Sequence, residues 1–270
     1  MSSKEPPIDF GAERRMQSLS SLWAFKAWMA SVAGLVAIFG FQSYYPNLIG
    51  PLSNVFPAVC ASCAFASALL CLRRYGLGLR SFQAIWFFFA LGTGLWIMAE
   101  TTWAIYYFLL NTSVPYPSVA DVFYIGGYFP IIAALGIYLG TFHVAMSRRR
   151  LGLAIVIIGI AVTLAMSFVL PVEFAKNLSF VNLMTDMIYP VLDLVLLSLA
   201  VLSLAIFYGG TIAKWWILFG VGATLYVIGD EFFLYQIARG TYYNGDLDDL
   251  IFLLGYLVFA LAFYTHRKEF

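Results

Sequence analysis

Carboxylates inside long apolar runs are the residues of this sequence that are best able to do chemistry. Glu100 and Asp230 each lie in the middle of an apolar segment, and Asp193 does so in a third. A charge at the centre of a bilayer costs about 2.5–3.5 kcal/mol on insertion scales, so such residues usually face a bundle interior and mark a site. A buried pair with one acid protonated and one ionised is suited to acid/base catalysis. A structural hydrogen bond explains these three acids equally well at this stage.

Two of these acids belong to a pattern that occurs twice, in residues 92–128 and 222–256. Each copy has an acid in an apolar run, a second acid after a short loop, and then a Gly-Tyr pair. An alignment with a two-residue gap matches Gly92 with Gly222, Trp96 with Tyr226, Glu100 with Asp230, Asp121 with Asp249, Gly127 with Gly255, and Tyr128 with Tyr256. The pattern favours a duplication, and shared membrane composition is the alternative explanation.

The elements that must position these residues are membrane-spanning helices. The chain has 270 residues, of which 62% are hydrophobic and only 11% charged, against about 25% charged residues in soluble domains. A spanning helix needs about 20 apolar residues. We therefore predict an all-α polytopic membrane bundle of eight helices, at 22–41, 54–73, 82–110, 119–145, 151–170, 183–207, 213–237 and 248–265. The sequence has no basic tract with interleaved aromatic residues, so we expect no nucleic acid partner.

Basic residues predict the orientation of the helices. With eight spans, thirteen of the fifteen Lys and Arg residues fall on one side, and only Lys176 and Arg239 fall on the other. The positive-inside rule then places both termini in the cytoplasm of a cell membrane. The predicted divisions are a polar tail over 1–20, a first four-helix repeat over 21–146, a second over 147–266, and a tail over 267–270. Four crossings separate the copies, so the two repeats run parallel to each other.

This topology gathers the acids in the outer half of the bundle, where aromatic side chains surround them. An interfacial aromatic belt accounts for most of these rings, but Trp96 and Trp103 flank Glu100 at helical spacings. We expect a ligand pocket formed by Trp96, Glu100, Trp103, Asp121, Tyr124, Tyr128, Asp193, Tyr226, Asp230, Glu231, Asp249 and Tyr256. The acids are expected to be neutral, to bind a hard divalent cation such as Ca²⁺ or Mg²⁺, or to cap helices, as we expect for Asp121, Asp246 and Asp248. His143 and His266 lie too far away for a histidine-based zinc or haem site.

A motif in the first copy resembles a known family. Its residues are Pro117, Ser118, Ala120, Asp121, Tyr124, Gly127 and Tyr128. They are similar to the multi-pass N-terminal membrane sensor regions of prokaryotic signalling proteins such as diguanylate cyclases and histidine kinases. The resemblance covers the third to the eighth helix and implies a sensory, ligand-binding module. No output domain follows before Phe270, so we expect signalling through a separate partner protein.

A second motif resembles one half of the lysoplasmalogenase-like eight-helix membrane hydrolases. It consists of Gly229 and Asp230 followed by the apolar run of residues 252–266. In the other half Ala99 and Glu100 replace the Gly-Asp or Ser-Asp pair of that family. This resemblance implies that Glu100 and Asp230 act as an acid/base pair on a vinyl ether or similar bond of a membrane lipid. Transport of ions or protons is less expected, because the acids form no chain across the membrane.

Overall fold

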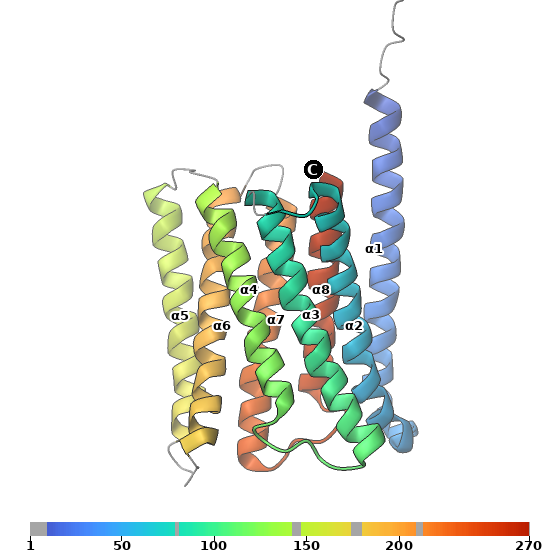
Figure 1. Cartoon of the computed structure of the whole chain (residues 1–270), viewed down its shortest axis with the longest axis vertical. Helices are drawn as coiled ribbons and strands as arrows, with labels where there is room; N and C mark the ends of the chain where they lie inside the picture. Colours follow the sequence, from blue (N-terminus) through green and yellow to red (C-terminus); the bar gives the residue numbers. More distant parts are fainter. Residues whose placement is uncertain (1–9, 79–80, 142–146, 174–179, 209–212, 270) are drawn as a thin grey trace, which may run out of the picture.

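The computed structural model describes residues 10–78, 81–141, 147–173, 180–208 and 213–269 (Figure 1). Within these ranges, the side chains of residues 10–22, 165–166, 168–173 and 269 are left undescribed. Lys4, Arg80, His143 and Lys176, which entered the sequence argument, lie outside the described residues, as do the side chains of Arg14 and Arg15.

Eight long α-helices make up almost all of the described chain. They are α1 (Phe10–Gly40), α2 (Pro46–Tyr75), α3 (Ser81–Ile105), α4 (Val119–Thr141), α5 (Arg148–Glu173), α6 (Phe180–Phe207), α7 (Ala213–Arg239) and α8 (Leu247–Glu269). A short 3-10 helix over Gln42–Tyr44 precedes α2, and a π-helical turn over Tyr106–Leu110 extends α3. The prediction of an all-helical chain is confirmed for the described residues. α1 begins at Phe10, inside the segment that we had expected to be a polar tail.

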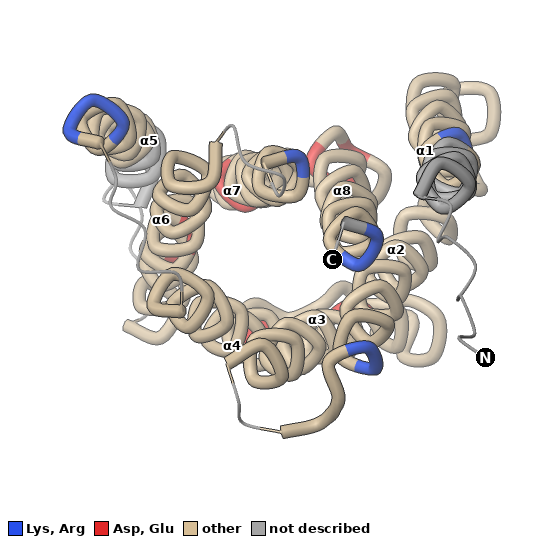
Figure 2. The backbone as a smooth tube through the Cα atoms, turned by 90° about the horizontal axis from the view of Figure 1, so that it is seen from above, with Lys and Arg blue, Asp and Glu red and all other residues tan. Residues whose placement is uncertain are grey.

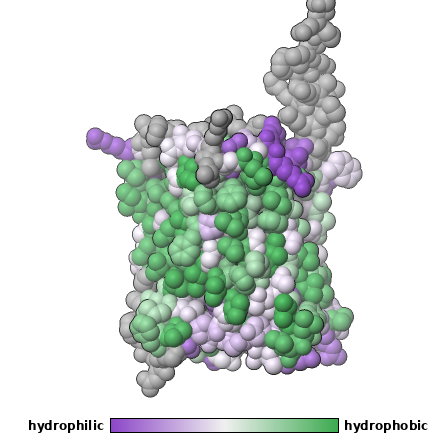
Figure 3. Space-filling model, in the orientation of Figure 1, coloured by the Kyte–Doolittle hydropathy of each residue, from purple (hydrophilic) through white to green (hydrophobic). Residues whose placement is uncertain are grey.

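The helices form an apolar body suited to a membrane. Seven of them are, over their described residues, long and apolar enough to cross a bilayer, from the segment Trp23–Gly40 of α1 to Leu247–Lys268 of α8. The surface in Figure 3 is hydrophobic over the middle of the bundle and hydrophilic toward its two ends. Together these features identify a multi-pass membrane protein.

Six of the helices close into a ring. Going round, α2 packs against α3, α3 against α4, α4 against α6, α6 against α7, α7 against α8, and α8 again against α2. Figure 2 shows this ring from one end, with α1 outside it near α8 and α5 outside it near α6. The hairpin formed by α3 and α4 therefore faces the hairpin formed by α7 and α8 across the ring.

Both described ends of the chain lie at the same end of the bundle (Figure 1). The basic residues gather there too: Arg73 and Arg74 end α2, Arg148 begins α5, Lys214 begins α7, and Arg267 ends α8 (Figure 2). Arg239, at the last residue of α7, lies at the opposite end. The bundle is thus electrically asymmetric along its axis.

Small residues allow the helices of the α3/α4 hairpin to approach closely. A Cβ atom added to Gly92 would lie 2.7 Å from the carbonyl oxygen of Gly127, which leaves no room for one. In the other hairpin, the carbonyl oxygen of Gly222 is 3.7 Å from a Cβ added to Gly255. Close backbone approach at small residues is a common way for helices to associate in membranes.

Candidate functional site

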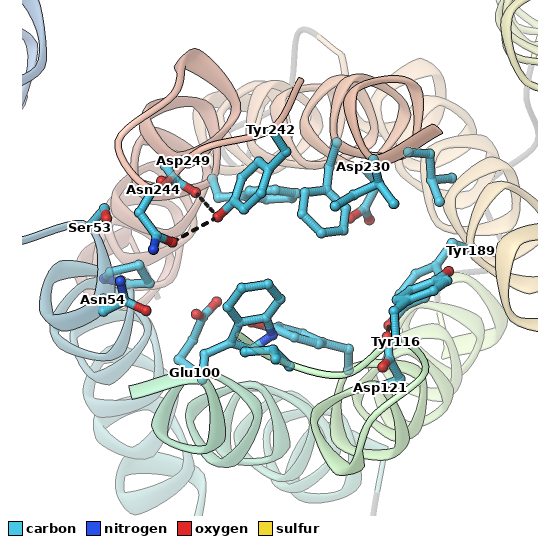
Figure 4. Close-up of a pocket in the computed structure, with 18 of the residues that line it drawn as sticks. Ser53, Asn54, Glu100, Tyr116, Asp121, Tyr189, Asp230, Tyr242, Asn244 and Asp249 are labelled. Carbon is cyan, nitrogen blue, oxygen red and sulfur yellow. Dashed lines mark hydrogen bonds between the residues drawn. The ribbon is translucent and has the colours of Figure 1, made fainter. Parts of the chain in front are cut away.

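A cavity of about 120 Å³ lies inside the ring, between the two hairpins (Figure 4). Its wall includes residues of α2, α3, α4, α6, α7 and α8, and residues of the α3–α4 and α7–α8 loops, at the end of the bundle away from the termini. Four carboxyl groups and six tyrosines line it, namely Glu100, Asp121, Asp230 and Asp249, and Tyr116, Tyr124, Tyr128, Tyr189, Tyr226 and Tyr242. The remaining lining residues are Ser53, Asn54, Pro57, Trp103, Val114, Pro115, Phe233, Leu234, Ile237, Asn244 and Phe252.

The structure brings most of the predicted site residues to this cavity. Those that line it are Glu100, Trp103, Asp121, Tyr124, Tyr128, Tyr226, Asp230 and Asp249. Four others, Trp96, Asp193, Glu231 and Tyr256, are absent from the lining. Of these, Trp96, Asp193 and Tyr256 are buried directly behind it, in contact with the lining tyrosines.

Hydrogen bonds between phenols and carboxyls join the two hairpins. The Tyr128 hydroxyl of α4 donates to the Asp230 carboxyl of α7 over 2.7 Å. Reciprocally, the Tyr256 hydroxyl of α8 donates to the Glu100 carboxyl of α3, also over 2.7 Å. Tyr128 is aligned with Tyr256 in the sequence, and Glu100 with Asp230. Each tyrosine therefore bonds to the acid of the other hairpin.

The contacts of Tyr128 restrict the protonation of its neighbours. Its hydroxyl is within hydrogen-bonding distance of both Asp193 and Asp230. A phenol carries one hydrogen and can donate it to only one of them. A proton shared between Asp193 and Asp230 would make both contacts favourable.

Trp96 fixes the tyrosines from behind the cavity wall. Its indole stacks on the Tyr226 ring, with centroids 4.5 Å apart and planes inclined by 10°. Its Nε1 atom donates to the main-chain carbonyl of Tyr124 over 3.2 Å. The Tyr226 and Tyr256 hydroxyls are 2.8 Å apart, so a chain of hydroxyls can lead from Tyr226 through Tyr256 to Glu100. Trp96 and Tyr226, which the alignment pairs, thus meet face to face at the interface of the hairpins.

Asp121 both lines the cavity and caps α4. Its carboxylate accepts the Ser118 main-chain N–H over 2.6 Å, while the Ser118 hydroxyl accepts the Ala120 N–H over 3.1 Å. This reciprocal arrangement is a capping box, and it confirms the capping role expected for Asp121. Its second carboxylate oxygen accepts the Tyr189 hydroxyl of α6 over 2.7 Å.

Asp249, the aligned partner of Asp121, accepts hydrogen bonds from the loop before α8 in a similar way. It accepts the Gly245 N–H over 2.6 Å and the Tyr242 hydroxyl over 3.2 Å. Burial, and next the negative charge of Asp249, raises the pKa of Tyr242, so this phenol keeps its proton and donates it. The Asp246 carboxylate accepts the Leu247 N–H at the start of α8, and the Asp248 carboxylate accepts from the Gln236 side chain over 3.4 Å.

Sequence reasoning missed several polar residues of the wall. Ser53 and Asn54 come from α2, Tyr189 from α6, Asn244 from the loop before α8, and Tyr116 from the loop before α4, where its hydroxyl bonds to Asp186. The signal for Asn54 was present, because an amide inside an apolar run is as unusual as an acid and needs a polar environment. Tyr116 and Tyr189 carry no such signal, since tyrosine is common at membrane interfaces.

The cavity holds no protein cation and no ready-made metal site. None of its lining residues is Lys, Arg or His. In the part of the chain that the structure describes, no three His, Cys, Asp or Glu side chains are grouped so that they could hold a metal ion. The hard divalent cation that the sequence left open as a cofactor therefore has no preformed set of protein ligands among these residues.

Fold and site together define a polytopic helical membrane protein with an internal acidic, tyrosine-rich cavity. Comparison of the chain with protein-family models, with curated proteins and with solved structures gives no match. The function must therefore be argued from the cavity itself.

Proposed function

We propose that this chain is a sensory, ligand-binding module of a cell membrane, and that its ligand occupies the cavity between the two hairpins. The observation that carries the proposal is a space of about 120 Å³ lined by four carboxyls and six phenols in the interior of an apolar bundle. Polar groups in the membrane interior are expensive, and they usually mark a site where the protein binds or transports something. Such concave, partly aromatic cavities are the usual form of small-molecule sites.

The position of the cavity suits a sensor. A ligand there would touch both hairpins, whose helices continue to the end of the bundle that holds the termini. A ligand that binds one arrangement of the hairpins more tightly than another shifts the population toward it. We propose that a separate signalling protein reads this shift at that end, as the likeness of residues 117–128 to prokaryotic sensor regions suggests.

The same proposal includes the duplication and the orientation. The exchanged bonds Tyr128–Asp230 and Tyr256–Glu100 support two parallel four-helix repeats related by an approximate two-fold axis. The basic residues at the end of the bundle with the termini support a cytoplasmic position for that end, by the positive-inside rule. The cavity would then face the outer half of the bilayer and its lipids.

The test is to purify the chain with native lipids and to identify bound species by mass spectrometry. We expect one species in addition to bulk lipid, and we expect Glu100→Gln and Asp230→Asn each to remove it. Asp246→Asn is the matched control, because it removes a carboxylate at the same end of the bundle and keeps a good helix cap. Retention of the species in both cavity variants, or its loss in the control, would contradict the proposal.

A lipid hydrolase is the second candidate, because Glu100 and Asp230 both line the cavity from opposing walls (Figure 4). One acid would donate a proton to the substrate while the other activates water, as in other carboxyl pairs. With a vinyl-ether lysophospholipid, addition of water would release an aldehyde and leave the glycerol hydroxyl. If the protein releases aldehyde from such a lipid, and Glu100→Gln and Asp230→Asn each abolish the release, the hydrolase is favoured. If the ligand is bound and remains unchanged, the sensor is favoured.

A further inference from the structure

We propose that the ligand of the cavity is a small organic cation, of the substituted ammonium class. This inference rests on the proposed function, since it names the chemistry of the species that the cavity would hold. It is carried by three features of the wall: its uncompensated carboxyls, its aromatic rings, and the way the carboxyls are spread.

The first feature is the charge of the wall. Four carboxyls line the cavity, with no Lys, Arg or His beside them. A shared proton can neutralise one acid of the Asp193 and Asp230 pair, but Glu100, Asp121 and Asp249 still have no protein cation in the lining. Arg239, at the same end of the bundle, instead lies over the Tyr235 ring, 4.8 Å from its centroid. Buried carboxylates without a countercharge are costly, and a cation entering a site of low dielectric offsets that cost.

The second feature is the supply of hydrogen bonds. The lining carboxyls accept side-chain hydrogen bonds from phenols and from one serine hydroxyl: Tyr256 to Glu100, Tyr189 and Ser118 to Asp121, Tyr128 to Asp230, and Tyr242 to Asp249. These donors are neutral. An ionised carboxylate has about four acceptor positions, and hydrogen bonds from charged donors are roughly twice as strong as those from neutral donors. The carboxyls can therefore still accept from a charged ligand.

The third feature separates an organic cation from a metal ion. The labelled carboxyls in Figure 4 lie around the cavity and do not converge on one point, in keeping with the absence of a three-ligand group among the described residues. Between them stand aromatic rings. Trp103, Phe233 and Tyr242 pack edge to face at the wall, with centroid distances of 5.1–6.4 Å. Aromatic faces attract organic cations through their π-electrons, and Trp does so most strongly.

The volume limits the size of the cation. A single water molecule needs about 10–15 Å³ of such space, so about 120 Å³ accommodates a small molecule and not a whole lipid. Both a free ammonium compound and the ammonium group of a lipid headgroup have the required chemistry. The experiment must therefore distinguish these two sources.

The first arm uses the full chain in nanodiscs of phosphatidylglycerol, which has no ammonium group. Choline is titrated, and its neutral carbon isostere dimethylbutanol, which has the same shape without the charge, is titrated in parallel. We expect choline to bind at least tenfold more tightly than the isostere. Glu100→Gln and Asp230→Asn should each weaken choline binding at least tenfold and leave the isostere unchanged, and Asp246→Asn should change neither.

The second arm repeats the titration in phosphatidylcholine nanodiscs, with the Asn244→Phe variant in both bilayers. Weaker apparent binding of added choline in phosphatidylcholine would assign the site to the headgroup, and unchanged binding would assign it to the free cation; both support the inference. Asn244→Phe adds a ring to the wall and keeps all four carboxyls, so it should abolish binding if the cation occupies the cavity.

Three outcomes would overturn the inference. If the isostere binds as tightly as choline and Asn244→Phe abolishes both, the cavity is a ligand site as proposed but is not selective for cations. If Ca²⁺ binds and choline does not, the ligand is an inorganic cation. If neither cation binds, and native preparations also contain no bound species, the proposed function falls together with the inference.

Discussion

At the scale of single residues, the site depends on bonds between phenols and carboxyls. The Tyr128 hydroxyl contacts two acids, Asp193 and Asp230, and the Tyr256 hydroxyl donates to Glu100. Each buried hydroxyl needs an acceptor, and each buried acid needs a donor or a proton. In a bilayer one such bond satisfies the hydroxyl and the acid together. These bonds also hold Glu100 and Asp230 in place at the cavity wall.

The Tyr128–Asp230 bond can be measured by a double-mutant cycle. We expect Tyr128→Phe and Asp230→Asn to be coupled by about 0.5–3 kcal/mol in the free energy of unfolding, since they share one hydrogen bond. Reversible unfolding in detergent micelles would give the four values. Tyr128→Phe combined with Asp246→Asn is the control and should be additive, because Asp246 bonds only locally to the start of α8. An additive result for the first pair would mean that the bond contributes nothing across the hairpins.

At the scale of elements, glycine at the α3/α4 crossing permits the close approach that places Trp96 behind the cavity. A Cβ atom on Gly127 would lie 2.5 Å from the Trp96 ring and 3.0 Å from the Gly92 carbonyl oxygen. A Cβ atom on Gly136, further along the same helix, would meet nothing within 4 Å. Gly127 and Gly136 therefore differ in what surrounds them.

This difference gives a matched pair of variants. Gly127→Ala should destabilise the protein by about 1–3 kcal/mol through overpacking. Gly136→Ala should be neutral or stabilising by up to about 1 kcal/mol, because alanine favours helix. Thermal unfolding in micelles measures both. Equal melting temperatures for the two variants would show that the α3/α4 crossing is looser than described.

The start of α4 gives another prediction at this scale. Ser118→Ala removes the hydroxyl that caps the Ala120 N–H and should cost about 0.5–2 kcal/mol. Hydrogen exchange should rise in the first turn of α4. Ser113→Ala, at an exposed position of the same loop, serves as the control and should change stability by less than about 0.5 kcal/mol. Unchanged exchange in Ser118→Ala would contradict the capping assignment.

At the scale of the whole molecule, the sequence predicted the class and most of the spans, because apolar length and polar loops are local properties. It could not predict that α1 begins at Phe10, since residues 10–21 are too polar to be recognised as part of a spanning helix. The predicted set includes the four acids that line the cavity, but also Trp96, Asp193, Glu231 and Tyr256, which are absent from its lining. Packing in three dimensions sets the rotation of each helix about its axis, so the sequence does not show which side chains face the cavity. The closure of the ring by α2 and α6 also depends on contacts between residues far apart in the sequence.

The orientation of the whole bundle is also testable. If the end with the termini is cytoplasmic, green fluorescent protein fused after Phe270 should fluoresce in bacterial cells, and alkaline phosphatase fused there should be inactive. Fusions truncated at Tyr243, in the loop at the other end, should give the opposite pattern. An active phosphatase at the C-terminus would reverse the proposed topology and place the cavity in the inner half of the bilayer.

The central claim is that an acidic cavity opens between the hairpins at the end away from the termini, and charge-selective labelling tests it most directly. Asn244, which lines the cavity, is replaced by Cys in a background that lacks Cys60, Cys63 and Cys71. Its reaction rates with a cationic and an anionic methanethiosulfonate are compared with those of Thr241→Cys, at an exposed position of the same loop.

We predict that the cation-to-anion rate ratio at position 244 exceeds that at position 241 by at least tenfold, and that Glu100→Gln together with Asp230→Asn removes the excess. Equal ratios at the two positions, or an excess that survives the loss of both carboxylates, would contradict the account.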